Sequence, residues 1–224
     1  MLSSICMFGD SVVKGVTFDS IKQRYIYLQE SFVNQIQKGL NISVENFAKF
    51  GCTIAKGTEI LYKNISSLAK SDITILEFGG NDCDFDWAAI AQDPYADHLP
   101  NTPLSEFSQR YSTLIKTVRN QGGTPTLLSL PPLYAPRYFK WVSKDKNVTN
   151  ILAFLGDVEY IYRWHEMYNT AVFRLGIESG TPVIDITTPF LSRKNYHELL
   201  CEDGIHPNKA GHALITRSIE AALA

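Results

Sequence analysis

Short apolar runs alternate with longer amphipathic segments along nearly the whole chain. The short runs are rich in β-branched and aromatic residues, as expected of strands that are buried on both faces of a sheet. We therefore predict five strands, at residues 3–8, 43–47, 73–78, 126–130 and 183–186. Such strands need a layer of helices on each face of the sheet, because neither face is suited to water.

The segments between these strands carry apolar residues at the three- and four-residue spacing of an amphipathic helix. In residues 27–39, for example, Leu28, Phe32 and Ile36 are four positions apart, and the segment ends at a glycine. The same pattern predicts helices at residues 58–69, 104–120, 159–178 and about 208–223. Strands that alternate with helices predict an α/β fold, built as one domain around a mainly parallel sheet of five strands.

The charge balance argues against several classes of partner. The chain has 21 basic and 23 acidic residues, so its formal net charge is only -2. This balance gives no electrostatic reason to expect a nucleic acid or an anionic membrane as partner. No apolar run approaches the ~18 residues of a membrane-spanning helix, so we predict no membrane span.

The first residues and the cysteines favour a cytoplasmic protein. The first basic residue is Lys14 and the apolar stretch before it is short, so we expect no signal peptide. The four cysteines include no C-x-x-C pair, and none has a histidine at metal-ligand spacing. We expect buried, reduced thiols and no metal site.

Residues that can carry chemistry follow the predicted strands. In a doubly wound sheet, ligands bind beyond the carboxyl ends of the strands. The first strand ends in "GDS", the second leads into "NFAKFG", and the third ends in "FGGND". A fourth motif, "EDGIHPNKAGH", stands just before the last helix. Each motif alone is an ordinary turn or cap, but their joint occurrence in this order favours a catalytic site.

Together these groups fit acyl transfer. The Ser11 hydroxyl is a weak nucleophile until a base takes its proton, and His206 can be that base. Asp203 can accept a hydrogen bond from the other ring nitrogen and stabilise the imidazolium. The N–H groups of Ser11 and Gly51 and the side-chain amide of Asn81 would stabilise the oxyanion.

The four motifs resemble the sequence blocks of the SGNH hydrolases, also called the GDSL esterase/lipase family. The matching segments are Gly9-Asp10-Ser11, residues 46–51, Gly79-Gly80-Asn81-Asp82 and Asp203-Gly204-Ile205-His206. One small departure is Val12, which stands where the family name has Leu. Another apolar side chain can pack in the same place, so this departure does not weaken the resemblance.

The resemblance implies a flavodoxin-like three-layer α/β/α sandwich that forms a single SGNH hydrolase domain over residues 1–224. It also implies a Ser-His-Asp hydrolase that needs no cofactor. In such an enzyme Ser11 is the nucleophile, His206 is the base and Asp203 orients the base. Gly51 and Asn81 would be the oxyanion-hole donors.

Residues 83–103 form a long insertion directly after the third motif, and insertions of this length are commonly functional. In it, Phe85 and Trp87 are candidates for an apolar or sugar-stacking wall of the substrate pocket. Asp84 is a candidate for accepting hydrogen bonds from substrate hydroxyl groups. An equally good interpretation is that the aromatic side chains only cover the edge of the sheet.

A second candidate wall follows the fourth strand, at residues 129–141. It contains Tyr134, a candidate for substrate contact, among several other aromatic residues. The same segment also fits a helical lid that packs on its own domain. As a third alternative it fits a contact between subunits, so a homo-oligomer stays possible.

The leading hypothesis is a serine carboxylic ester hydrolase that acts through an acyl-enzyme intermediate on a small-molecule ester. No broad exposed apolar lid is evident, which favours acetyl or other short acyl groups on carbohydrates or small molecules over long-chain lipids. One alternative is a thioesterase or lysophospholipase with the same triad. Another is a catalytically silent binding protein of the same fold.

Overall fold

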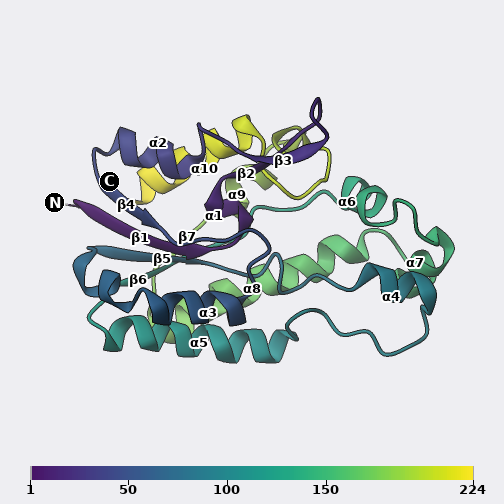
Figure 1. Ribbon diagram of the computed structural model, residues 1–224, viewed down its shortest axis with the longest axis horizontal. Coiled ribbons are helices and arrows are strands. Elements are labelled where there is room, and N and C mark those ends of the chain that lie inside the picture. Colours follow the sequence, from purple (N-terminus) through teal and green to yellow (C-terminus); the bar gives the residue numbers. More distant parts are fainter. Residues whose placement is uncertain (1, 224) are drawn as a thin grey trace.

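The computed structural model describes residues 2–223 and has a parallel sheet at its centre (Figure 1). The sheet strands are β1 (Ser4–Gly9), β4 (Ser43–Asn46), β5 (Ile73–Glu77), β6 (Pro125–Leu128) and β7 (Val183–Ile184). Their order in space is β4-β1-β5-β6-β7, and every neighbouring pair is parallel. The predicted α/β fold with a five-stranded sheet is confirmed, and the sheet is parallel throughout.

This strand order places a topological switch point between β1 and β5. Counted along the chain, the sheet strands are arranged second, first, third, fourth, fifth, which is the flavodoxin-like order. The chain leaves β1 for one edge of the sheet and returns through β5 toward the other. A crevice forms at the carboxyl ends of these two strands, because their connections run to opposite sides.

Helices cover both faces of the sheet (Figure 1). One layer contains α2 (Phe32–Gly39), α9 (Thr187–Leu191) and α10 (Lys209–Leu223), and the other contains α3 (Ile54–Lys63), α5 (Leu104–Asn120) and α8 (Tyr160–Ser179). Each layer buries its apolar side chains against the sheet in a core of its own. The burial of these two apolar faces is the main stabilisation of the fold.

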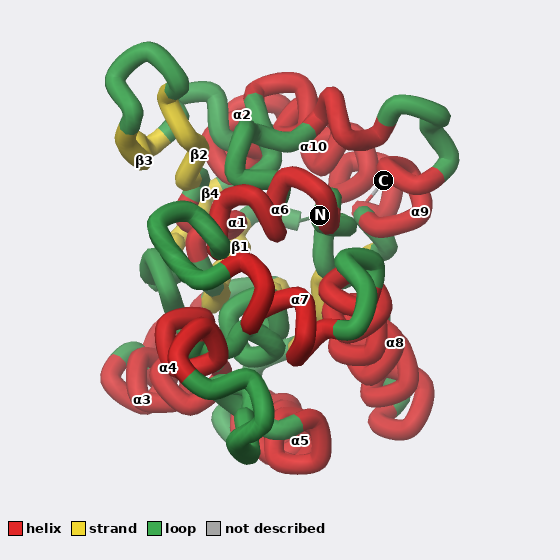
Figure 2. The backbone as a smooth tube through the Cα atoms, turned by 90° about the vertical axis from the view of Figure 1, so that its right-hand side faces the viewer, coloured by secondary structure: helices red, strands yellow, loops and turns green. Residues whose placement is uncertain are grey.

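A further group of short helices lies beyond the carboxyl edge of the sheet (Figure 2). These helices are α4 (Trp87–Gln92), α6 (Ala135–Val142) and α7 (Val148–Leu155). They share a third apolar core that includes Trp87, Tyr138, Ile151 and Ile161. Ile161 belongs to the first turn of α8, so this group, which we call the cap, is joined to the main body through that helix.

The remaining elements are short. The first of them is α1 (Ser11–Lys14), which is followed by an antiparallel hairpin of β2 (Val16–Asp19) and β3 (Arg24–Tyr27). Two 3-10 helices, η1 (Ile65–Lys70) and η2 (Tyr196–Leu199), complete the set. No helix within residues 2–223 is long and apolar enough to cross a membrane.

The prediction of one helix over residues 27–39 is wrong at its start. Residues 24–27 form β3, and the helix begins only at Phe32. The reason is local, because the Ser31 side chain accepts a hydrogen bond from Asn34 N–H and so caps the helix there. The hairpin before it was not predicted.

Other predicted boundaries move by fewer residues. The helix predicted at 58–69 begins four residues earlier, at Ile54, and ends at Lys63, after which the chain continues as η1. The fifth strand ends at Ile184 instead of 186, and the fourth spans Pro125–Leu128 instead of 126–130. The helix predicted at 104–120 is confirmed at both ends.

Candidate active site

Ser11 follows β1 after a single residue, Asp10, and is the first position of α1. Asp10 caps this helix through a 2.8 Å hydrogen bond from Val12 N–H to its Oδ1. The turn needs glycine at position 9, because a Cβ there would lie 2.6 Å from the Val13 side chain. The chain can therefore turn sharply at the end of the strand, and Ser11 faces the crevice.

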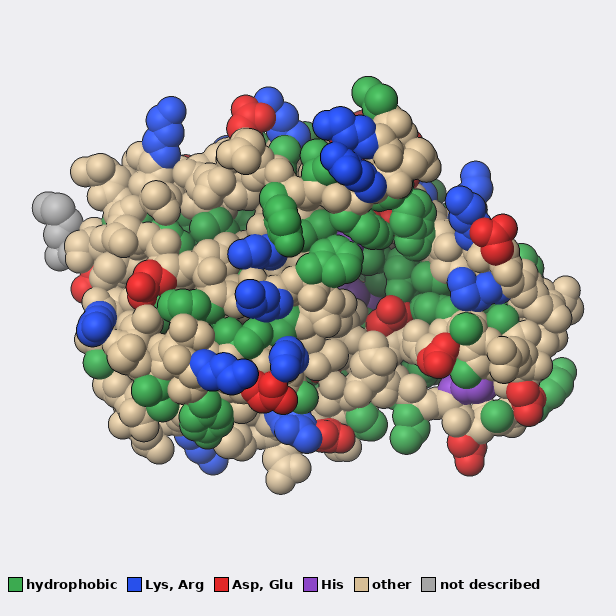
Figure 3. Space-filling view, viewed as in Figure 1, with side chains coloured by type: hydrophobic (Ala, Val, Ile, Leu, Met, Phe, Trp, Pro, Cys, Tyr) green, Lys and Arg blue, Asp and Glu red, His purple; other side chains and the backbone are tan. Residues whose placement is uncertain are grey.

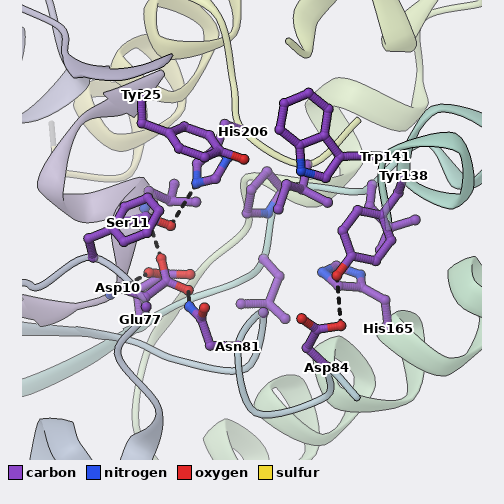
Figure 4. Close-up of a pocket in the computed structure, with 18 of the residues that line it drawn as sticks. Asp10, Ser11, Tyr25, Glu77, Asn81, Asp84, Tyr138, Trp141, His165 and His206 are labelled. Atoms are coloured by element: carbon purple, nitrogen blue, oxygen red, sulfur yellow. Dashed lines mark hydrogen bonds between the residues drawn. The ribbon is translucent and has the colours of Figure 1, made fainter. Parts of the chain in front are cut away.

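His206 reaches Ser11 from the other end of the chain (Figure 4), and Asp203 supports it from behind. The Nε2 atom of His206 is 2.9 Å from Ser11 Oγ, and its Nδ1 atom is 2.6 Å from Asp203 Oδ2. Because Asp203 accepts at Nδ1, the proton of the neutral ring belongs on that nitrogen, which leaves Nε2 to accept from Ser11. The structure thus brings together the three side chains that the sequence motifs singled out.

Asp203 keeps its charge although it is fully buried. Burial alone would raise the pKa of this carboxyl, but the hydrogen bond with His206 holds it below the ordinary value. The backbone N–H groups of Ile205 and His206 also donate to Oδ1, at 3.0 and 3.1 Å. A charged, fixed carboxylate can orient the imidazole and stabilise its protonated form.

Gly51 and Asn81 lie on the walls of the same pocket. The segment before Gly51 is tied to the first strand by the Lys49 N–H, which donates to Gly9 O at 3.1 Å. Gly51 has a left-handed φ of 67°, a backbone conformation that glycine adopts more easily than other residues. The Asn81 Nδ2 group donates to Asp10 Oδ2 at 2.9 Å, so this carboxylate fixes the direction of the amide.

Glu77 is a member of the site that sequence reasoning missed. This last residue of β5 is buried, lines the pocket, and has one carboxyl oxygen, Oε1, without a hydrogen-bond partner. Burial, and then the neighbouring charge of Asp10, raise the pKa of Glu77 well above its ordinary value. We therefore take Glu77 to be the protonated member of this pair of acids. A single acidic residue at the end of an apolar strand was the available signal.

Aromatic rings enclose His206 and were also missed. The ring of Tyr25, from β3, is 5.1 Å from the His206 ring, and the Phe50 ring stacks on it at 6.1 Å. Trp141, from α6, lies 6.2 Å from Tyr25 and closes the same wall. Tyr25 could not be assigned to the site because the hairpin that carries it was not predicted, whereas Phe50 stands next to Gly51 in the second motif, which was an available signal.

The pocket has a volume of about 250 Å³ and opens between the carboxyl edge of the sheet and the cap. Figure 3 shows the hollow lined mainly by hydrophobic side chains, with an acidic and a histidine side chain visible inside it.

Within residues 2–223, no group of three or more His, Cys, Asp or Glu side chains is arranged to hold a metal ion.

The residues suggested as substrate contacts are placed differently from one another. Asp84 lines the same pocket as Ser11, on the opposite side. Phe85 and Trp87 line a smaller adjoining cavity of about 30 Å³ instead, as part of the packing of the cap. Tyr134 lines neither cavity, and its ring stacks on His197 at 4.9 Å.

A comparison with protein families finds one match that spans most of the chain. The model of the GDSL-like Lipase/Acylhydrolase family matches residues 7–214. No curated protein sequence matches the chain. The matched region contains all four motifs and every residue of the Ser11–His206–Asp203 arrangement.

Solved structures with a similar fold cover nearly all of the chain. The lipase/acylhydrolase from Enterococcus faecalis is 19% identical, with a TM-score of 0.69 over 99% of this chain and 97% of that one. The esterase EstA from Pseudoalteromonas sp. is 15% identical, with a TM-score of 0.62 over 99% and 96%. A mutant of an acetyl-xylooligosaccharide esterase from Geobacillus Stearmophilus is 15% identical, with a TM-score of 0.67 over 99% and 94%. At these identities the similarity concerns the fold.

The protonation of Glu77 predicts a specific effect of pH on stability. A raised pKa means that the folded state keeps a proton which the unfolded state loses above about pH 4.5. The free energy of unfolding of the wild type should therefore fall as the pH rises above that value. Glu77→Gln removes this titration, so its stability relative to wild type should rise by about 1 kcal/mol or more between about pH 5 and 8.

Urea unfolding of both proteins at several pH values measures this difference. Glu178→Gln, at an exposed position of α8, is the matched control and should follow the wild type. A stability difference between Glu77→Gln and wild type that stays constant between about pH 5 and 8 would show that Glu77 is charged in the folded state.

Proposed function

This chain belongs to the GDSL-like lipase/acylhydrolase family and is an esterase, and we propose that it cleaves its ester with Ser11 as nucleophile. The observation that carries the proposal is the unbroken chain of hydrogen bonds from Asp203 through His206 to Ser11. All three side chains are almost completely buried, and the serine and histidine line one pocket. We propose that residues 1–224 form a single hydrolase domain around this pocket.

In the first half of the reaction, His206 Nε2 takes the proton of Ser11 as Oγ attacks the carbonyl carbon of the ester. Asp203 stabilises the imidazolium that results. The tetrahedral intermediate then collapses, the bond to the alcohol oxygen breaks, and His206 gives its proton to the leaving alcohol. The acyl group remains on Ser11.

In the second half, a water molecule loses one proton to His206 while its oxygen attacks the acyl carbon. The bond between the acyl group and Ser11 Oγ breaks, and His206 returns the proton to the serine. The free acid leaves and the enzyme is restored. No cofactor is needed in either half.

The oxyanion of each tetrahedral intermediate needs donors that are already in position. We propose Asn81 and Gly51, together with the N–H of Ser11, for this role. Asn81 is oriented by its bond to Asp10, so its second amide hydrogen is left for the oxyanion. Each such donor contributes about 3 kcal/mol to the lowering of the barrier in comparable sites.

We propose acetyl or another short acyl group as the part that is transferred. The pocket volume of about 250 Å³ is below the range of about 300–1,000 Å³ that is usual for larger ligands. The likeness of fold to an acetyl-xylooligosaccharide esterase supports short acyl esters of carbohydrates. No feature of the pocket favours a thioester or a lysolipid.

Replacement of the nucleophile gives the direct prediction. Ser11→Ala should lower kcat/KM for p-nitrophenyl acetate by at least about 1,000-fold, because no acyl-enzyme can form. The matched control is Ser105→Ala, at an exposed position of α5, which should have the rate of the wild type. Equal rates for Ser11→Ala and wild type would exclude the mechanism.

The pocket volume predicts the chain-length preference. In a series of p-nitrophenyl esters, kcat/KM should fall by at least about 10-fold between the acetyl and the dodecanoyl ester, because a long chain cannot enter the pocket. A rate that rises with chain length, or a faster reaction with an acyl-CoA of long chain, would contradict the short-acyl assignment and favour a lipase or thioesterase.

A further inference from the structure

The pocket contains a second imidazole and carboxylate pair, which the proposed reaction does not use. His165 and Glu166 are neighbours on α8, and His165 is only 5% exposed although it lines the pocket. Its Nδ1 atom lies 3.5 Å from Glu166 Oε1, and neither atom has a closer hydrogen-bond partner. A buried imidazole beside a carboxylate calls for an explanation, because burial of such polar groups is costly.

Glu166 is held in place from behind. Its Oε2 accepts a hydrogen bond from Asn169 Nδ2 at 3.1 Å, and Asn169 Oδ1 in turn accepts from Leu130 N–H at 2.9 Å. Burial opposes the charge on Glu166, but His165 and Asn169 lower the pKa of this carboxyl below its ordinary value. A charged Glu166 faces Nδ1, so the proton of the neutral His165 ring belongs there.

In the neutral form of the ring, the other nitrogen of His165 is therefore an acceptor. Nε2 makes no hydrogen bond to any of the residues that the structure describes. It is also not one of their polar atoms that are both buried from solvent and without a hydrogen-bond partner. Since Nδ1 is turned to Glu166 and the ring lines the pocket, Nε2 is the atom that a bound molecule can reach. It can accept one hydrogen bond from that molecule.

Asp84 offers a second acceptor in the same pocket. Its Oδ1 accepts from the Tyr138 hydroxyl at 2.6 Å and from Trp87 Nε1 at 2.8 Å, which fixes the carboxyl group. No hydrogen bond within residues 2–223 uses its Oδ2. Figure 4 shows Asp84, Tyr138 and His165 on the side of the pocket opposite Ser11 and His206.

We propose that His165 Nε2 and Asp84 Oδ2 bind hydroxyl groups of the alcohol part of the ester, which is a sugar or a similar polyhydroxylated ring. The inference rests on the proposed function, because it concerns the group that leaves from Ser11. Two fixed acceptors select a ligand with two donors, and the Tyr138 and Trp141 rings in the wall suit the apolar face of a sugar ring.

A cationic alcohol is the competing occupant, since a carboxylate among aromatic rings also attracts cations. Two observations favour hydroxyl groups instead. The charge of Asp84 is already partly compensated by two donors on Oδ1. A quaternary ammonium group cannot donate a hydrogen bond to His165, so this imidazole would stay unpaired.

The test compares two acetyl esters of similar size, methyl 4-O-acetyl-β-D-xylopyranoside and cyclohexyl acetate, of which only the first carries hydroxyl groups. We expect His165→Leu to lower the ratio of kcat/KM for the sugar ester to that for the cyclohexyl ester by about 10-fold, mainly through KM. His165→Gln keeps an acceptor oxygen and should restore most of the ratio. His98→Leu, outside the pocket, is the matched control and should leave the ratio unchanged.

Binding can also be measured without turnover, by titrating the Ser11→Ala protein with methyl β-D-xylopyranoside in a calorimeter. The added His165→Leu substitution should weaken this binding about 10-fold. An unchanged ratio and unchanged binding in folded His165 variants, or a preference for acetylcholine over the sugar ester, would overturn the inference. Lack of Ser11-dependent hydrolysis of p-nitrophenyl acetate would instead overturn the proposed function, which the binding measurement does not require.

Discussion

The burial of the Asp203 carboxylate is the constraint on which the site depends. With none of its surface exposed, its charge must be compensated, and His206 Nδ1 and two backbone N–H groups supply the compensation. The same bonds turn the imidazole so that Nε2 meets Ser11, 195 residues earlier in the chain. Stability of this end of the fold and orientation of the base therefore come from the same hydrogen bonds.

The flavodoxin-like strand order explains why so many polar groups meet here. Ser11 follows β1 and Asn81 follows β5, the two strands that flank the switch point. The order also crowds the buried acids Asp10, Glu77 and Asp82 at one edge of the sheet. Hydrogen bonds from Val12, Asn81, Ile54 and Thr102, and a retained proton on Glu77, make this crowding tolerable.

Local patterns predicted the parts of the fold that depend on local physics. The apolar runs located all five sheet strands to within a few residues, and the helix at 104–120 was confirmed at both ends. The hairpin was missed because the helical spacing of Leu28, Phe32 and Ile36 starts directly after its second strand, so the predicted helix included Tyr27, the last residue of β3. In the structure the helix begins only after its N-cap, Ser31. Tyr25 and His165 meet the pocket only through contacts between distant segments, which spacing along the chain does not encode.

The central claim is that the folded protein activates Ser11. Mass spectrometry after reaction with a fluorophosphonate tests this most directly, because an activated serine displaces fluoride and becomes phosphonylated. The account predicts a single phosphonyl group on Ser11 in the folded protein and none after unfolding in denaturant. A folded protein that remains unmodified at Ser11, or that carries the group on another residue, would contradict it.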